Sequence, residues 1–336
     1  MTTMKVHEWV ERAMTLADVQ AVTDLFNATS LADLGLLDTD FDEMDTHFRT
    51  PGMDLATDTL LIETRQGQAV AFAEVWDVRE PRIRAWCWIT VHPDYRRQGL
   101  EQRLIDWIEE RAQWGLQRVP DGLRVCYVTN MPEANRSDGR AFAEAGWTWV
   151  RQTRVMRIEM NEAPPQPVLP PSIKIHAVKP GEEMPVLRAM QESFLDHWGG
   201  VDEPFDVYYE RMMEFVRHTK DFDYSLWFAA YEGDQVCGTA MNLPKTQEDE
   251  GMGWVNTLGV RRPWRKQGVG LALLQHTFGE FYRRGTRRVG LGVDADSLTG
   301  ATRLYERAGM QILRAYNVYE KEIRAGQDLA TRSIEA

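Results

Sequence analysis

The sequence predicts an α/β protein, of the α+β kind, in which two copies of one fold follow each other. Three observations indicate this. The chain has 336 residues, which is long enough for two ordinary domains. A strand, a basic loop and a helix recur in the same order in both halves, as expected of an internal duplication. Five of the twelve residues 161–172 are prolines, which disfavour both helix and central strand. We therefore expect domains at 1–160 and 173–325, a linker at 161–172 and a tail at 326–336.

In the first half, apolar periodicity predicts a strand, two helices, three strands and a longer helix that ends at a glycine. The expected elements are, in order, the strand 5–11, the helix from Asp18 to Asn27, a helix that opens in the acidic stretch 38–45, the strands 59–64, 68–78 and 83–91, and a helix that stops at Gly115.

In the second half, the same signals predict a similar succession. The expected elements are the strand 173–178, helices around 182–198 and 205–219, the strands 225–231, 235–243 and 254–260, a helix that stops at Gly285, the strand 288–294, a helix at 299–308 and a last strand at 315–323.

Composition excludes several classes of protein. A formal net charge of -12 argues against a nucleic-acid-binding surface. The three cysteines show no C-x-x-C spacing and the seven histidines show no ligand motif, so we expect no metal. No stretch approaches the roughly 20 apolar residues that a membrane span needs. The first ten residues also lack the apolar centre of a signal peptide, so we expect a cytoplasmic protein with no membrane partner.

The stretch 254–285 predicts an anion-binding loop. A short apolar strand ends at Val260, the loop carries Arg265 and Lys266, and a helical pattern begins after Gly268. The first N–H groups of a helix have no partner inside it, and the macrodipole adds partial positive charge there. Because Gly268 and Gly270 have no Cβ, the backbone can approach a phosphate or pyrophosphate closely.

Arg265-x-x-Gly268-x-Gly270 resembles the Q/R-x-x-G-x-G/A signature of the GNAT acyltransferase superfamily, whose members bind acetyl-CoA at this loop. Neither a P-loop nor a dinucleotide fingerprint matches. The resemblance implies two tandem GNAT domains, each with a mixed, mostly antiparallel sheet flanked by helices. It also implies a set of residues that contact acetyl-CoA: Leu258, Gly259, Val260, Arg265, Lys266, Gln267, Gly268, Val269, Gly270 and Ser297. Ser297 stands where the family often has an Asn.

A second motif, Leu304-Tyr305-Glu306-x-x-Gly309, is similar to the family's L-Y-E-x-x-G-F. The resemblance implies that Tyr305 lies beside the sulfur of CoA and acts as the general acid for the departing thiolate. It also implies that the strand before the loop separates from its neighbour, and that the backbone N–H of Val260 donates to the carbonyl oxygen.

The general base stays open at this point. Asn256 and Thr257 are polar but not basic, and Trp254 stands near the place where a strand carboxylate would be expected. Further candidates lie where two helices are joined: Asp196, His197, Asp202 and Glu203.

The two copies are unequally equipped. The position that matches Gly270 is Glu101, whose carboxylate would repel a pyrophosphate. The position that matches Tyr305 is Phe142, which has no proton to donate. This pattern resembles the tandem GNAT proteins, the double-domain group that includes mycothiol synthase. It implies a degenerate N-terminal copy and a catalytic C-terminal copy.

The resulting prediction is an N-acyltransferase that moves an acetyl group from acetyl-CoA to an amine of a small molecule or peptide by direct attack. The alternative is a non-catalytic acyl-CoA-binding regulatory or scaffold protein. Either could be a monomer with pseudo-dimeric halves or a homodimer.

Overall fold

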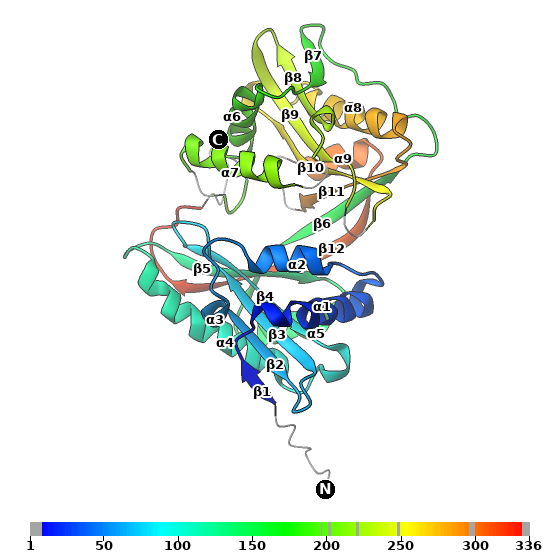
Figure 1. The fold of residues 1–336 in the computed structure, drawn as a ribbon. Coiled ribbons are helices and arrows are strands. Elements are labelled where there is room, and N and C mark those ends of the chain that lie inside the picture. Colours follow the sequence, from blue (N-terminus) through cyan, green and yellow to red (C-terminus); the bar gives the residue numbers. More distant parts are fainter. Residues whose placement is uncertain are drawn as a thin grey trace. The chain divides into compact units, whose positions relative to one another are not determined.

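A computed structural model describes residues 9–195, 197–200, 203–219, 222–246, 249–295 and 300–330. Contacts between residues divide the chain into two compact units (Figure 1). One unit holds the chain up to Gln152 together with Tyr316–Asp328, and the other holds Thr153–Ala315. Each unit is built from one sheet with helices on its faces, which confirms the predicted fold class.

The first unit contains the helices and strands that the sequence predicts between residues 18 and 115. Of the predicted strand 5–11, residues 5–8 lie outside the described residues, and Val10 and Glu11 belong to a strand. The elements of this unit are β1 (Val10–Arg12), the 3-10 turn η1 (Leu16–Asp18), α1 (Val19–Leu34), α2 (Phe41–Phe48), α3 (Leu55–Asp58), β2 (Thr59–Glu63), β3 (Ala69–Trp76), β4 (Arg84–Val91), η2 (Pro93–Tyr95), α4 (Leu100–Gly115), η3 (Leu116–Arg118), β5 (Val125–Pro132) and α5 (Arg136–Glu144). Two longer strands follow α5 and α9, namely β6 (Thr148–Glu159) and β12 (Gln311–Arg324).

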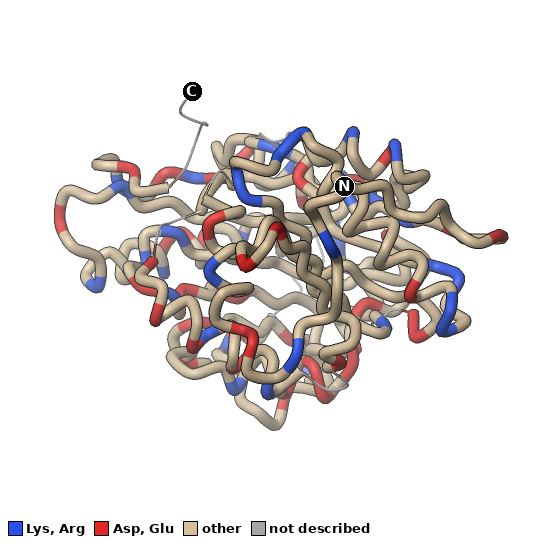
Figure 2. The backbone as a smooth tube through the Cα atoms, turned by 90° about the horizontal axis from the view of Figure 1, so that it is seen from above, with Lys and Arg blue, Asp and Glu red and all other residues tan. Residues whose placement is uncertain are grey.

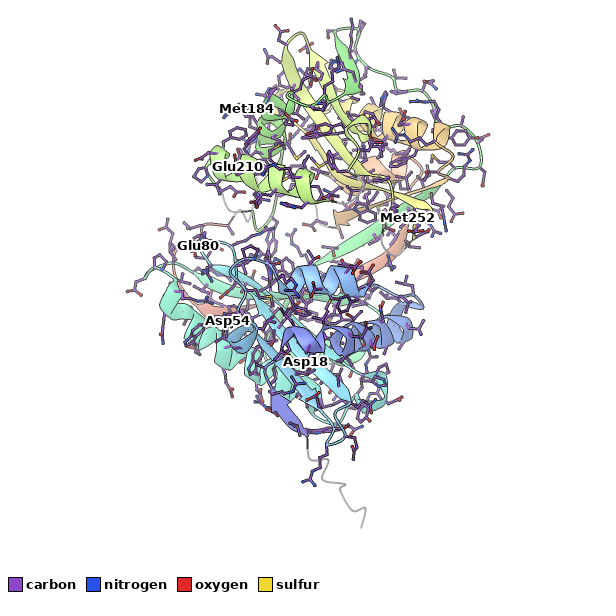
Figure 3. All side chains as sticks on the ribbon, viewed as in Figure 1. Asp18, Asp54, Glu80, Met184, Glu210 and Met252 are labelled. Atoms are coloured by element: carbon purple, nitrogen blue, oxygen red, sulfur yellow. The ribbon has the colours of Figure 1, made fainter. Side chains whose placement is uncertain are left out.

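The second unit repeats the order of the first. Its elements are β7 (Ile173–Ala177), α6 (Glu183–Phe194), α7 (Phe205–His218), η4 (Tyr224–Leu226), β8 (Trp227–Glu232), β9 (Gln235–Leu243), β10 (Met252–Val260), η5 (Arg262–Trp264), α8 (Val269–Arg283), β11 (Arg288–Asp294) and α9 (Ala301–Arg307). Met184 on α6 and Glu210 on α7 are labelled in Figure 3.

Within each unit the described strands pair mostly antiparallel, and one pair among them is parallel. In the first unit the strands follow the order β1-β2-β3-β4-β5-β12, with β4 and β5 parallel. In the second unit the order is β6-β11-β10-β9-β8-β7, with β10 and β11 parallel. The corresponding strands therefore form the parallel pair in each copy, as a duplication predicts.

The last strand of each copy is exchanged. β12, at the end of the chain, pairs with β5 of the first unit from Tyr316 to Arg324. β6, which precedes the proline-rich stretch, pairs with β11 of the second unit. The described residues 161–172 between β6 and β7 contain neither helix nor strand. The domain boundaries expected from the sequence stay a prediction, and the exchange that crosses them was not foreseen.

The sheet of the second unit is buried on both faces. Phe228 and Ala230 belong to the apolar cluster under α8 and α9, whereas Trp227 and Ala229 belong to a separate cluster under α6 and α7. This alternation follows from the two-residue period of a strand. The faces of the sheet are therefore distinct, and the side on which a β10 residue points decides which helices it meets.

The described residues were also compared for charge, cysteines, membrane-spanning helices and metal-binding groups. Lys and Arg are interspersed with Asp and Glu along the traced chain (Figure 2). Cys87, Cys126 and Cys237 are buried. Over the residues described, there is no helix with the length and apolarity to cross a membrane. The same residues contain no group of three or more His, Cys, Asp or Glu that could hold a metal ion.

Candidate active site

The site is centred on the point where β10 and β11 part. In the described portions of both strands, the parallel pairs begin at Met252 with Arg288 and end at Val255 with Leu291. Both strands continue, β10 to Val260 and β11 to Asp294. On its other edge β10 stays paired with β9, with a shift in register between Val255 and Thr257. The bulge turns β10 away from β11, so among the described residues the end of β10 has no strand partner on this edge.

The direction of the backbone groups on this edge follows from their neighbours. The N–H of Arg261 donates to the carbonyl of Cys237, so it points toward β9. Successive N–H groups of a strand point to opposite edges. The N–H of Val260 therefore points away from β9, toward the opening, and so does that of Leu258. Leu258 and Val260 also pack against the apolar cluster under α8.

The loop after β10 opens onto the first turn of α8. Gly268 is the N-cap of this helix with a φ of 86°, and among the described residues no side chain caps this exposed end. Lys266 also lies in the left-handed region, with a φ of 62°. Lys266, Gln267 and Gly268 are exposed, whereas Val269 is buried. An uncapped helix start behind a glycine turn offers N–H donors and partial positive charge to an anion.

Gly270 brings this helix start against α9. A Cβ built at Gly270 would lie 3.2 Å from Cδ2 of Leu304 and 3.5 Å from Cγ2 of Val260. The first distance is a tight contact and the second an ordinary one. A side chain longer than that of alanine must therefore displace Leu304 or Val260. Gly270 therefore joins the loop, the end of β10 and the helix that carries Tyr305.

Arg265 braces the site from inside the protein. Its Nε donates to the carbonyl oxygen of Val260 at 2.9 Å, and its Nη2 donates to the carbonyl oxygen of Ser193 at 3.1 Å. The guanidinium thus ties the end of β10 to the end of α6. The sequence predicted a charge beside the anion and missed this bracing role. Gln267 is also engaged locally, because its amide donates to the carbonyl of Pro263 at 2.8 Å.

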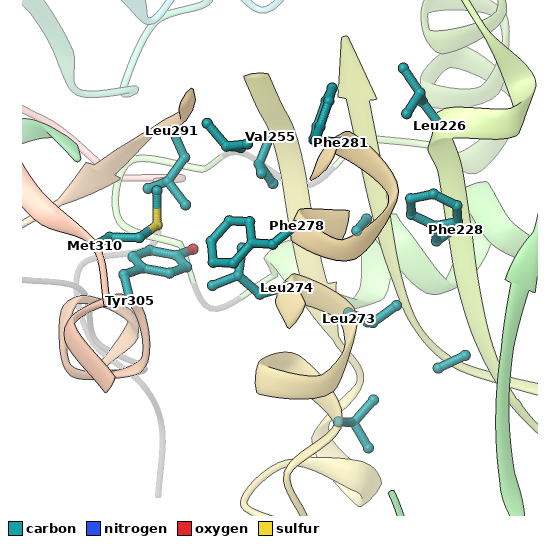
Figure 4. Packing of buried hydrophobic residues seen from close by; sticks show 14 of the residues in the cluster. Leu226, Phe228, Val255, Leu273, Leu274, Phe278, Phe281, Leu291, Tyr305 and Met310 are labelled. Atoms are coloured by element: carbon teal, nitrogen blue, oxygen red, sulfur yellow. The ribbon is translucent and has the colours of Figure 1, made fainter. Parts of the chain in front are cut away.

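Tyr305 is the buried aromatic residue of α9. It is 7% exposed and packs in the cluster with Leu274, Phe278 and Met310 (Figure 4). Burial raises the pKa of its phenol to about 12, because the phenolate would be poorly solvated. Within the part of the chain that is described, the phenol oxygen has no hydrogen-bond partner. The group is therefore protonated at neutral pH and has its proton available.

The first unit repeats the backbone of this loop. Arg97 has a φ of 62°, the same as Lys266, and the N-cap Gly99 has a φ of 88°. Glu101 is 5% exposed, and its Oε1 accepts from the N–H of Arg97 and from Oγ of Ser137, both at 3.0 Å. A carboxylate of the chain itself therefore binds the loop that would otherwise hold an anion.

Phe142 takes the place of the phenol in the first unit. Its ring is fully buried, with its centroid 4.9 Å from that of Trp147 and 6.5 Å from that of Tyr319. The position is therefore filled by aromatic packing alone.

The remaining predicted residues are less informative. Ser297, Asp196 and Asp202 lie outside the described residues. The ring of His197 packs against Phe194, with 4.3 Å between the centroids. Glu203 forms an ion pair with Arg211. On β10, Asn256 is exposed and Thr257 is half-buried.

Comparison with known proteins gives the family. The model of the Acetyltransferase (GNAT) family matches residues 23–131 and again residues 187–310, which together cover more than half of the chain. The chain belongs to the GNAT acetyltransferase family. Its two matches also confirm the predicted tandem arrangement, and the family confirms the prediction of an acyltransferase.

Relatives extend this result over nearly the whole length. A GCN5-related N-acetyltransferase structure from Sphaerobacter thermophilus is 34% identical, covers 95% of this chain and 97% of its own, and superposes with a TM-score of 0.80. The mycothiol acetyltransferase of Streptomyces scabiei is 29% identical over 239 residues, or 70% of each chain. A tandem GNAT protein from the clavulanic acid biosynthesis pathway, 14% identical with a TM-score of 0.67, shares the fold.

Proposed function

We propose that the second unit of this GNAT protein transfers an acetyl group from acetyl-CoA to an amine of a small molecule or peptide by direct attack. The observation that carries the proposal is the parting of β10 from β11 beside the uncapped start of α8, with the protonated Tyr305 on the adjoining helix. The mycothiol acetyltransferases among the relatives support a small-molecule amine as acceptor.

Each part of acetyl-CoA has a matching group in this arrangement. The pyrophosphate would bind the N–H groups of the loop from Lys266 to Gly270 at the start of α8. The missing Cβ of Gly270 lets this helix start lie close to Leu304 and Val260. The pantetheine arm would extend the sheet by bonding to the free edge of β10 from Leu258 to Val260. The contact of Ser297 with the coenzyme belongs to the same proposal.

The reaction needs an oxyanion donor and an acid. The amine nitrogen attacks the thioester carbonyl carbon, and the N–H of Val260 donates to the oxygen as it becomes negative. The C–S bond then breaks, the sulfur leaves with the electron pair, and the phenol of Tyr305 supplies its proton. The acetylated nitrogen gives up its surplus proton to solvent, and the phenolate of Tyr305 takes a proton back from solvent. The products are the N-acetylated amine and free CoA.

The first unit has a different part in this proposal. Glu101 already binds its loop, and Phe142 replaces the phenol. This half would bind no acetyl-CoA, because a second anion in the loop would meet the carboxylate of Glu101.

The test uses the full-length protein. Isothermal titration with acetyl-CoA is expected to give one bound coenzyme per chain, and a free-thiol assay is expected to show CoA release that depends on added amine. Tight binding without release on any amine would favour a binding or scaffold protein instead. Two coenzymes per chain would overturn the assignment of the halves.

A further inference from the structure

Trp254 lies at the second-to-last paired position before β10 and β11 part. It is paired with Gly290, and the parallel ladder ends one residue later. A Cβ built at Gly290 would lie 2.9 Å from Cζ3 and 3.1 Å from Cε3 of this indole, and one built at Gly292 would lie 3.9 Å from Cζ2. The ring therefore lies on the backbone of β11. It covers Gly290, where a Cβ would clash with it, and reaches Gly292, where a Cβ would be in ordinary contact with it.

The indole faces the side of the sheet opposite α8. Its neighbour Gly253 faces α8, because a Cβ there would lie 2.5 Å from the ring of Phe281. Consecutive strand residues point to opposite faces, so Trp254 points toward the face that α6 and α7 cover. Met252, labelled in Figure 3, points the same way, and its Sδ would be 3.3 Å from a Cβ at Gly290.

A second aromatic residue, Phe194 of α6, lies on this face beside the end of β10. A Cβ at Gly259 would lie 2.8 Å from Cβ of Ser193 and 3.0 Å from Cε2 of Phe194, both on α6. Phe194 is thus on the same face as the indole, next to the residues proposed to hold the thioester. The coenzyme loop and Tyr305 belong to α8 and α9 on the other face.

The indole also extends toward the opening. It reaches from Gly290 to Gly292, which is the direction in which β10 and β11 separate, and two strand residues span about 7 Å. Trp254 is half-buried, so one side of the ring lies on β11 while part of the residue stays accessible. The polar neighbours on β10, the exposed Asn256 and the half-buried Thr257, carry no charge.

From this placement we propose that Trp254 is a specificity-determining residue, which selects acceptor amines that carry a planar aromatic group near the nitrogen. The proposal rests on the proposed function and names its substrate class. An aromatic group of the acceptor stacks on the indole or meets it edge-on, and Phe194 borders the same side. Trp254 is not proposed to bind the amino group itself as a cation, because a protonated amine has no lone pair with which to attack the thioester.

The experiment compares two acceptors of equal size, 2-phenylethylamine and 2-cyclohexylethylamine, with acetyl-CoA as donor. The full-length protein is expected to show a kcat/KM at least threefold higher for the planar amine, because an aromatic contact is worth about three- to tenfold in affinity. In Trp254→Leu this ratio falls to about one through a higher KM for the planar amine. In Trp254→Phe most of the preference is kept, and the KM for acetyl-CoA is unchanged in both variants.

The results separate this inference from the proposed function. A ratio near one in the wild-type protein, or an unchanged ratio in Trp254→Leu, overturns the inference while leaving acetyl transfer intact. If no amine is acetylated, the proposed function fails, and the inference is then tested with the unreactive probes 2-phenylethanol and 2-cyclohexylethanol by ligand-observed NMR. Equal binding of the two alcohols overturns the inference about Trp254. Tighter binding of the planar alcohol that is lost in Trp254→Leu supports it.

Discussion

The carboxylate of Glu101 accepts a hydrogen bond from the backbone N–H of Arg97 at 3.0 Å. The loop in which this happens has the same backbone turn as the proposed coenzyme loop of the other half, with a left-handed residue two positions before a left-handed glycine. One copy thus supplies its own anion, and in the other copy the equivalent donors are the ones that we propose to bind the coenzyme.

Removing this internal anion tests its role. In Glu101→Ala, the N–H of Arg97 and the hydroxyl of Ser137 lose their acceptor, which is expected to lower the free energy of unfolding by about 1–3 kcal/mol. Urea denaturation measures this change. Glu110→Ala on the same helix is exposed and should stay within about 0.5 kcal/mol of the wild type. The kcat/KM for acetyl transfer should be the same in Glu101→Ala as in the wild type. A loss of activity in this variant would contradict the assignment of catalysis to the second unit.

Gly270→Glu should abolish binding of acetyl-CoA. The new Cβ crowds Leu304 at 3.2 Å, and the carboxylate meets the pyrophosphate at the helix start. Titration calorimetry provides the measurement. The matched control is Gly279→Glu on the same helix, where a Cβ meets nothing within 4 Å. Normal coenzyme affinity in Gly270→Glu would contradict the placement of the pyrophosphate.

Tyr305→Phe should lower kcat by about a hundredfold or more, since the acid that protonates the thiolate is lost. The dissociation constant of acetyl-CoA should change by less than about twofold, because the ring that packs in the cluster is kept. Initial rates of thiol release give kcat, and titration calorimetry gives the dissociation constant of acetyl-CoA. Tyr282→Phe, in the same unit, serves as control and should retain full activity. An equally active Tyr305→Phe would assign the proton to another donor.

Arg265→Ala should weaken both stability and coenzyme use. The carbonyls of Val260 and Ser193 lose hydrogen bonds from a charged donor, which is worth about 1.5–3 kcal/mol for each bond before relaxation. A looser end of β10 should also raise the KM for acetyl-CoA. Thermal unfolding and initial rates measure these effects, with the exposed Arg307→Ala as control. A raised KM without loss of stability would favour direct contact of Arg265 with the coenzyme.

Asp138 in the first unit predicts a pH-dependent stability. Burial raises the pKa of its carboxyl from the ordinary 3.8 to about 7. The folded state then binds a proton that the unfolded state has lost between about pH 4 and pH 7, so the stability contributed by this group falls as the pH rises through that window.

Asp138→Asn should remove this slope. The carboxamide is neutral at every pH and can still accept the bond that Asn135 Nδ2 gives to Asp138 Oδ2. The variant is expected to be more stable than the wild type at pH 8 by on the order of 1 kcal/mol or more, with the difference shrinking toward pH 4. Urea denaturation as a function of pH measures the difference. A variant that is destabilised equally at both pH values would show that Asp138 is ionised throughout.

The sequence predicts much of the fold because its signals are local. Gly268 and Gly99 mark helix starts that only a left-handed residue could make, and the apolar runs on either side identify the strands. The coenzyme loop and Tyr305 were therefore placed on the right elements. Whether they bind and act as expected stays a prediction for the measurements above.

Other features depend on partners that are distant in sequence. The periodicity of β6 and β12 fits an inner strand of either sheet, so it cannot tell which sheet each one joins. The bracing by Arg265 depends on the carbonyl of Ser193, a residue on another helix. The indole of Trp254 is placed by two glycines of a different strand, Gly290 and Gly292. Such relationships follow from the tertiary structure alone.

The exchange of β12 has a consequence for biosynthesis. The first unit lacks its strand beside β5 until Tyr316–Arg324 has been translated, more than 160 residues after Gln152. At about 5–20 residues per second, the ribosome needs roughly ten to thirty seconds for that distance. During this interval one edge of β5 has no ladder on the nascent chain, which is the kind of surface that chaperones shield. The amino-terminal half is thus made first and completed last.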